Sequence, residues 1–226
     1  MATRLCGRYK LAATGDEVAE FFGLGDAPAL TPRYNIAPTQ TVPVVRRRPE
    51  GAGLEAAFMR WGLVPSWAQD LSIGSRMINA RAETVAEKPA FRHAVRHRRC
   101  LVPADGFYEW RKDGPRKLPY LFRVRDGGLF AFAGLWERWS APDVPAVETF
   151  TILTTTPNDL VAPLHDRMPV IVDRENHARW LDPDASWADD LQPLVVPFAA
   201  ANMEAYAVST LVNRPGVDDP RCAEPW

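Results

Sequence analysis

A cysteine stands near the front of the sequence, in the stretch Leu5-Cys6-Gly7-Arg8-Tyr9. Thiols are the strongest nucleophiles among ordinary side chains, but they react as thiolates, and a nearby cation lowers the pKa of a thiol. A cysteine with a free α-amine can also capture an aldehyde: the amine forms an imine, and the thiol then closes a five-membered thiazolidine ring. The alternative is a structural cysteine in a first strand, because free cysteine is commonly buried.

A glutamate lies among aromatic residues in the stretch Phe107-Tyr108-Glu109-Trp110. Aromatic neighbours remove water from a carboxylate, which raises its pKa and allows it to serve as general acid and base near neutral pH. The alternative is a solvent-facing glutamate on the polar side of a hairpin. Glu109 is therefore a candidate proton-transfer residue.

Two further stretches hold closely spaced polar groups. Asn79, Arg81 and Glu83 alternate, so in an extended segment they share one face, which indicates a site or a polar network. His165 is followed by Asp166 and Arg167 in an expected loop, where a histidine can act as acid or base. A surface histidine with solvated neighbours is the alternative reading.

Aromatic and proline-bounded segments offer binding surfaces. Residues 32–39 form a loop between prolines that contains Asn35 and Pro38, which suits binding better than a tight turn. Residues 61–67 place two tryptophans around glycine and proline. They form either a packing corner or a ledge on which unstacked bases lie, and base stacking on an aromatic contributes about 1–3 kcal/mol.

Composition excludes several classes of protein. The 226 residues contain no long apolar run and no secretory signal, and three widely spaced cysteines without a CxxC indicate neither zinc nor disulfides. Glycine-rich nucleotide motifs and HExxH are absent, so we expect no cofactor and no metal. These features predict a cytoplasmic protein that does not associate with membranes.

Charge is distributed unevenly along the chain. Residues 1–125 hold 21 Lys and Arg against 12 Asp and Glu, whereas residues 126–226 hold 6 against 16. The chain has 23 arginines and 4 lysines, and arginine binds phosphate and stacks on bases. A nucleic-acid surface in the first half is indicated, although a GC-rich genome also favours arginine over lysine.

Many short stretches with β-branched and aromatic alternation predict strands, whereas helix signals are few. The expected fold is α+β: a single domain with a β-rich core of mostly antiparallel strands and several short peripheral helices. Helices are expected over residues 14–23, 89–99, 174–181 and 187–191. We expect the domain to span residues 6–212 and the Pro- and Asp-rich residues 213–226 to be a poorly ordered tail.

Six motifs in order carry a family resemblance: Cys6-Gly7-Arg8-Tyr9, Tyr34-Asn35-Ile36-Ala37-Pro38-Thr39, Trp61-Gly62-Leu63-Val64-Pro65-Ser66-Trp67, Asn79-Ala80-Arg81-Ala82-Glu83-Thr84, Arg99-Cys100-Leu101-Val102-Pro103-Ala104-Asp105-Gly106-Phe107-Tyr108-Glu109-Trp110 and His165-Asp166-Arg167-Met168-Pro169. Together they resemble the SRAP family, the SOS-response-associated peptidases or abasic-site-processing proteins. The resemblance implies a DNA-damage-response protein that binds single-stranded DNA at abasic sites and cross-links to the open-chain aldehyde through a thiazolidine.

The resemblance also implies roles for individual residues. Cys6 matches the nucleophile, Asn79 an amide that orients it, Glu109 the group that transfers protons, and His165 the group that assists sugar ring opening and reversal. Candidate DNA contacts are Arg8, Asn35, Pro38, Trp67, Arg81 and Arg167. Autopeptidase and lyase activities are further implications, and the protein is expected to be a monomer that is nucleoid-associated when bound to DNA.

One departure from the family pattern concerns residues 1–5. Family members begin Met-Cys-Gly-Arg, and removal of the methionine exposes the cysteine, but here five residues precede Cys6. An amide nitrogen cannot form an imine. We therefore expect a leader that is absent from or removed in the mature protein, either because translation starts at the codon of Leu5 or because the protein cleaves itself.

Two other functions compete with this interpretation. A cysteine peptidase using Cys6, His165 and Asn79 would turn over external peptides without a free α-amine. A non-covalent single-stranded-DNA-binding protein would bind DNA in a salt-sensitive manner and would not depend on Cys6.

Overall fold

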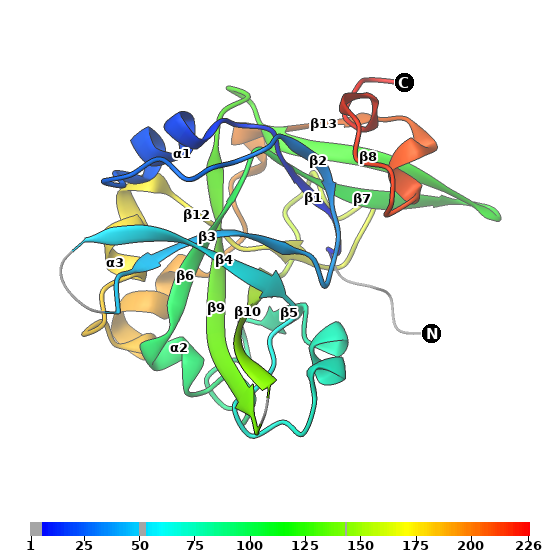
Figure 1. Ribbon diagram of the computed structural model, residues 1–226. Helices are drawn as coiled ribbons and strands as arrows, with labels where there is room; N and C mark the ends of the chain where they lie inside the picture. Colours follow the sequence, from blue (N-terminus) through cyan, green and yellow to red (C-terminus); the bar gives the residue numbers. More distant parts are fainter. Residues whose placement is uncertain (1–5, 50–52, 143) are drawn as a thin grey trace.

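A computed structural model describes residues 6–49, 53–142 and 144–226. Its strands form two sheets, one of which closes on itself (Figure 1). Short helices lie at the periphery, and most strand pairs are antiparallel, which confirms the expected fold class. The proposed leader, residues 1–5, lies outside the described residues.

The larger sheet contains a closed ring of five strands in the order β10, β4, β3, β6, β9, with β9 pairing back to β10. Ring closure gives each of these strands a neighbouring strand on both sides. Their bounds are Thr41–Arg47 for β3, Leu54–Trp61 for β4, Arg99–Ala104 for β6, Phe130–Ala141 for β9 and Val144–Thr155 for β10. Three short strands extend it: β5 (Asn79–Arg81) and β11 (Met168–Pro169) pair with β10, and β12 (Ile171–Val172) pairs with β9.

The smaller sheet has the order β13, β8, β7, β1, β2 and lies at the upper right of Figure 1. Its strands are β1 (Tyr9–Leu11), β2 (Arg33–Ile36), β7 (Gly106–Asp113), β8 (Arg116–Val124) and β13 (Met203–Ala207). Strand β7 follows β6 directly, so one continuous segment leads from the ring into this sheet. The sheet holds the beginning of the chain against β7.

The first helix, α1 (Gly15–Phe22), confirms the expected capping signals. Thr14 and Glu17 form a reciprocal capping box, and Gly23 ends the helix in the left-handed conformation. The other predicted helices are in part shorter than expected or of another helical type. Of residues 89–99 only α2 (Ala94–His97) is α-helical, residues 174–181 divide into a 3-10 turn (Arg174–Asn176) and α3 (His177–Trp180), and Trp187–Leu191 is one π-helical turn.

Further 3-10 turns lie between the strands and after β13. They are Leu71–Arg76, Gln192–Leu194, Ala200–Asn202, Thr210–Asn213 and Pro220–Cys222. No helix in the described part of the chain is long and apolar enough to cross a membrane.

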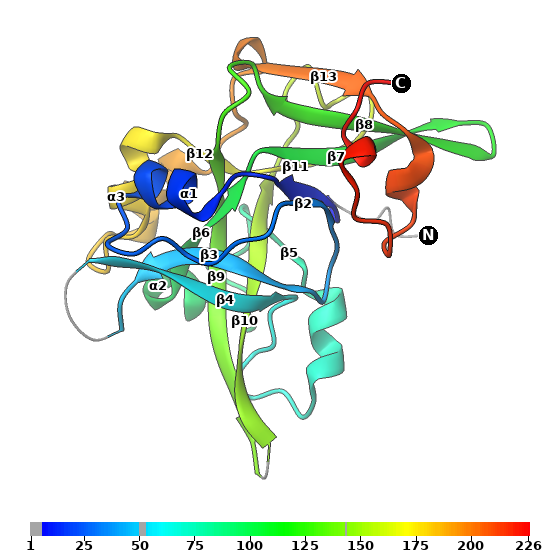
Figure 2. The ribbon, with the colours of Figure 1, turned by 45° about the horizontal axis from the view of Figure 1, so that its top comes forward.

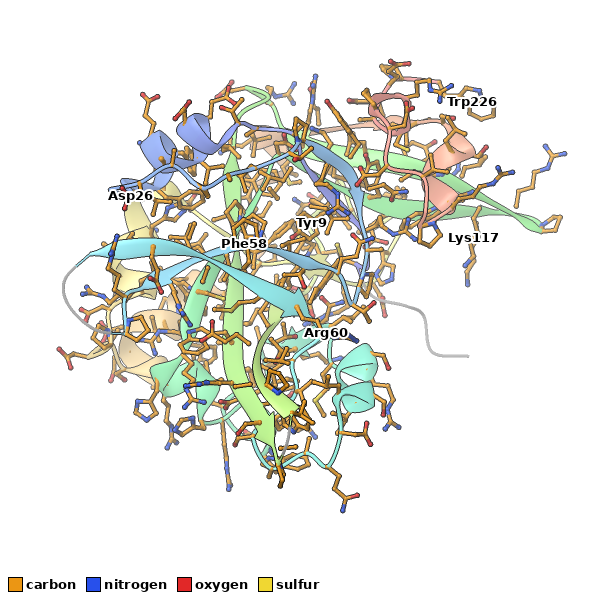
Figure 3. The ribbon with its side chains drawn as sticks, viewed as in Figure 1. Tyr9, Asp26, Phe58, Arg60, Lys117 and Trp226 are labelled. Atoms are coloured by element: carbon orange, nitrogen blue, oxygen red, sulfur yellow. The ribbon has the colours of Figure 1, made fainter. Side chains whose placement is uncertain are left out.

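Aromatic side chains fill the core between the two sheets. The Tyr9 ring packs edge-on against Trp61 and Phe132, with ring centroids 5.3 and 5.8 Å apart. In Figure 3 Tyr9 lies near the centre of the molecule, whereas Lys117 and Trp226 lie at its periphery. Trp61 is fully buried and donates its indole N–H to the Ile78 carbonyl, so this tryptophan is a packing residue and not part of a stacking ledge.

Gly62 allows two backbone segments to touch. Its φ is +123°, and a Cβ at this position would lie 2.6 Å from the carbonyl oxygen of Gly74. We predict that Gly62→Ala lowers the free energy of unfolding by about 2–4 kcal/mol, since it adds a backbone clash to the conformational strain. Urea unfolding measures the loss. Gly127→Ala is the matched control: its φ is +69° but its Cβ would meet nothing, so a loss of only about 1 kcal/mol is expected, and equal losses would contradict the close approach.

Residues 213–226, which the sequence predicts to be a poorly ordered tail, make specific contacts with β2 in the structure. The Asn35 amide donates to the carbonyls of Arg214 and Val217, and the Asp218 carboxylate accepts from the backbone of Tyr34 and Asn35. Cys222 is buried in a small second core. Figure 2 shows this segment, in red, crossing beside β2, β7 and β8. Proline and aspartate here form turns that dock on β2, which composition alone did not reveal.

Candidate active site

Strand pairing places Cys6 beside Glu109. Tyr9 pairs with Phe107 across β1 and β7, and the Tyr108 backbone N–H donates to the Arg8 carbonyl at 3.0 Å. Continuing this antiparallel register brings the residues before Tyr9 alongside those after Phe107. Two residues that are about a hundred positions apart in sequence thus become neighbours.

Cys6 and Glu109 form a buried thiol–carboxyl pair. Their exposed fractions are 1% and 2%, and the two side chains lie close enough for each to shift the pKa of the other. Burial raises the pKa of both groups well above their usual values, and the neighbouring Glu109 charge raises that of the thiol further. The pair can therefore release one proton far more readily than two. Burial and Glu109 outweigh the Arg8 backbone N–H, which acts to lower the pKa of the thiol.

Asn79 holds the backbone of Cys6. It lies on β5, which pairs in parallel with β10, and its Nδ2 donates to the Cys6 carbonyl oxygen at 3.0 Å. The amide thus fixes the residue that carries the thiol. Its Oδ1 is buried and has no hydrogen-bond partner among the described residues.

His165 lies in the loop before β11, on the other side of the same end of β10. Its Nδ1 is 3.0 Å from the Arg167 backbone nitrogen, which donates to it, and 3.1 Å from Asp166 Oδ1. The ring is largely buried. Its Nε2 has no hydrogen-bond partner among the described residues.

Three buried polar atoms of the predicted catalytic residues therefore lack partners in the described part of the chain: Asn79 Oδ1, Glu109 Oε1 and His165 Nε2. Buried polar atoms are satisfied in most proteins, so such a group of exceptions marks a place for water or a polar ligand. The described residues contain no group of three His, Cys, Asp or Glu that could hold a metal ion.

Two of the predicted DNA contacts, Arg8 and Asn35, bind each other. Arg8 Nη1 donates to Asn35 Oδ1 at 2.7 Å and to the Val212 carbonyl at 2.8 Å, and the guanidinium lies 5.7 Å from the centre of the Trp110 ring. Asn35 is fully buried. In this structure both residues connect the Cys6 stretch to the C-terminal segment.

Arg167 is bound within the protein, whereas the Arg81 side chain is exposed. Arg167 donates to both carboxylate oxygens of Glu83, at 2.6 and 2.8 Å, and to the Thr154 carbonyl at 2.5 Å. This pair lowers the pKa of Glu83. Arg81 is exposed and hydrogen-bonds to no described residue through its side chain, so its guanidinium is available to a ligand without breaking an ion pair.

Pro38 and Trp67 lie at the surface. Trp67 is 61% exposed, which is unusual for a tryptophan, and Pro38 is half-buried. The backbone N–H of Thr39, next to Pro38, donates to the Trp61 carbonyl at 2.8 Å. The two loops that carry these residues are thus joined at Trp61.

Sequence reasoning did not predict the contacts of two residues that organise the site. Glu83 was expected on one face with Asn79 and Arg81, but it lies beyond β5 and neutralises Arg167. Asp218, in the segment expected to be poorly ordered, caps the backbone of β2 and pairs with Arg33. An acid two positions after Asn79-x-Arg81 was the only signal for the first, and no local pattern indicated the second.

The fold and these motifs define a class of protein. The family model for SOS response associated peptidase (SRAP) matches residues 5–215, and the chain belongs to this family. The chain is 43% identical over 224 residues to a Bacillus subtilis protein named abasic site processing protein YoqW, covering 97% of this chain and 99% of the relative. It is 29% identical to abasic site processing protein HMCES of Xenopus tropicalis, covering 88% of this chain and 67% of that protein.

A solved structure has the same fold. A crystal structure of a Bacteroides thetaiotaomicron protein superposes with a TM-score of 0.88 at 30% identity, covering 98% of this chain and all of the other. The similarity therefore includes both sheets and the C-terminal segment.

Proposed function

We propose that this protein processes abasic sites in single-stranded DNA by forming a covalent thiazolidine between Cys6 and the abasic-site aldehyde. The observation that carries the proposal is the buried Cys6–Glu109 pair. Asn79 holds the backbone of Cys6 through a hydrogen bond to its carbonyl oxygen. Two of its relatives are named abasic site processing proteins, which supports the choice of substrate.

The chemistry follows from two groups on one residue. The α-amine of Cys6 adds to the aldehyde carbon and water leaves, which gives an imine. The thiol sulfur then bonds to the same carbon, the C=N electron pair moves to nitrogen, and the thiol proton is transferred to that nitrogen. Glu109 lies beside the thiol and can carry this proton. The product is a neutral thiazolidine, and no oxidant or metal is consumed.

His165 assists the opening of the sugar ring, since only the open form has an aldehyde. Its unpartnered Nε2 is available to the sugar oxygen. Arg81, Trp67 and Pro38 are the exposed or half-exposed candidates for contacts with the flanking strand. Arg8, Asn35 and Arg167 remain candidates, but each would have to exchange a hydrogen bond seen here.

A free Cys6 amine requires that no residue precedes it in the reactive protein. Five residues precede it in the sequence, so we propose either initiation at the codon of Leu5 or hydrolysis of the Leu5–Cys6 peptide bond by the protein itself. Intact-mass measurement of natively expressed protein decides between a chain that begins at Cys6 and one that keeps its leader. An active protein that still begins at Met1 or Ala2 would exclude the thiazolidine.

The function is tested with single-stranded DNA that carries one abasic site. We expect a protein–DNA adduct that survives denaturation and forms without added reductant, whereas the same oligonucleotide with an intact base gives none. Protein whose mass shows a free Cys6 must be used. Absence of an adduct from such protein would contradict the proposal, and turnover of external peptides instead would favour a cysteine peptidase.

A further inference from the structure

One nitrogen of His165 faces two partners that cannot both be satisfied. Nδ1 is 3.0 Å from the Arg167 backbone N–H, a donor, and 3.1 Å from the Asp166 carboxylate, an acceptor. A bare Nδ1 accepts from Arg167, whereas a protonated Nδ1 cannot accept and has the Asp166 carboxylate as the nearby acceptor. The position of one proton therefore selects the partner.

This choice determines what the opposite nitrogen can do. When Nδ1 is bare in the neutral ring, the proton is on Nε2, which is then a hydrogen-bond donor only. For a doubly protonated ring to release the Nε2 proton into the site, the remaining proton must stay on Nδ1. This proton transfer leaves a neutral ring with hydrogen on Nδ1. Without a hydrogen-bond acceptor near Nδ1, that form of the ring is unfavourable.

We propose that Asp166 positions the proton of His165: its carboxylate stabilises the form with hydrogen on Nδ1, in competition with the Arg167 amide, and so enables Nε2 to give up and take back a proton. The inference rests on the proposed function of the site, in which His165 acts on the abasic sugar. Asp166 is a positioning residue, since it reaches the chemistry only through the ring.

The charges around the ring favour this role. Among the described residues, Arg167 is neutralised by its two-pronged pair with Glu83, Arg81 lies beside the same glutamate, and Cys6 and Glu109 form their own pair. The only ion-pair contact of Asp166 in the described part of the chain is with His165. After burial, its charge also contributes to the raised pKa of Glu109. The Asp166 side chain is 74% exposed, so the effect should weaken with added salt.

Nitrogen-15 NMR of the full-length protein tests the proton position without DNA. In the neutral ring of the wild type we expect a measurable fraction with hydrogen on Nδ1, because nitrogen shifts distinguish the two tautomers. Asp166→Asn should lower the ratio of the Nδ1–H to the Nε2–H form about three- to fivefold, as a charge-assisted hydrogen bond becomes a neutral one. Asp166→Glu should retain much of the Nδ1–H form, because its side chain still carries a carboxylate. Asp173 is an exposed aspartate whose side chain makes no capping hydrogen bond. Asp173→Asn removes the same charge and should leave the tautomer ratio unchanged.

Kinetics supplies the second readout. In Asp166→Asn the rates of adduct formation and reversal should fall about 3- to 30-fold, part of what a general acid–base group contributes, while Asp166→Glu recovers most of the loss. A wild-type ring without the Nδ1–H form, or a tautomer ratio unchanged in Asp166→Asn, would overturn the inference. Absence of an adduct from the wild type would instead defeat the proposed function, and the NMR result would still decide the tautomer.

Discussion

Cys6→Ala should abolish the denaturation-resistant adduct with abasic single-stranded DNA, lowering its yield at least about 100-fold. Without the sulfur, an imine formed by the α-amine cannot close to a ring and reverses by hydrolysis. The substitution replaces a small buried side chain, so the fold should persist at a cost of about 1–2 kcal/mol. Yield is measured on denaturing gels with and without borohydride, which traps an imine but is not needed for a thiazolidine.

Cys100→Ala is the matched control for this prediction. Cys100 is also a buried free thiol, but it lies in β6 of the ring, where its carbonyl accepts from the Trp180 indole. This variant should form the adduct as the wild type does. An undiminished adduct in Cys6→Ala, stable without borohydride, would show that another group carries the chemistry.

Glu109→Gln should slow adduct formation by about 100- to 10,000-fold. The amide keeps the size of the side chain but can no longer take the thiol proton. Burial raises the pKa of Glu109, so in the wild type the carboxylate becomes available only as pH rises through that raised value. In the wild type the observed rate of adduct formation should rise over this pH range. In Glu109→Gln the part of the pH dependence that comes from Glu109 should be absent.

Stability separates this chemical effect from misfolding. A carboxyl whose pKa is raised on folding binds its proton more tightly in the folded state, so ionising it at higher pH costs stability. The glutamine variant has no such charge. It should therefore unfold at pH 8 at a temperature no lower than the wild type, as measured by circular dichroism. A strong loss of stability at pH 8, or wild-type cross-linking, would contradict the role assigned to Glu109.

Local signals in the sequence predicted much of the fold. Alternation of β-branched and aromatic residues indicated the long strands, and Thr14, Glu17 and Gly23 indicated α1 with its caps. The closure of the ring was not predictable, because the pairing of β4 with β10 joins segments about ninety residues apart. The helix expected over residues 89–99 shortened to Ala94–His97, since tertiary contacts outweighed its amphipathic pattern.

The sequence indicated which residue types form the candidate site. It did not indicate how burial and ion pairs change their pKa values and charges. The spacing and neighbours of Cys6, Glu109 and His165 marked them as chemical groups, and the structure brings the first two into contact. The raised pKa of the thiol depends on burial by the two sheets, which no pattern around Cys6 revealed. The pairing of Arg167 with Glu83 likewise required the parallel contact between β5 and β10.

The docking of residues 212–218 on β2 has a consequence for the order of folding. Arg8, two positions after Cys6, hydrogen-bonds to a carbonyl 204 positions later in the chain. Contacts of such long range form late because closing a large loop costs entropy. During synthesis, the surroundings of the thiol are thus completed only after Val212 has left the ribosome. A nascent chain would have an incomplete site, which delays aldehyde capture until the whole domain has folded.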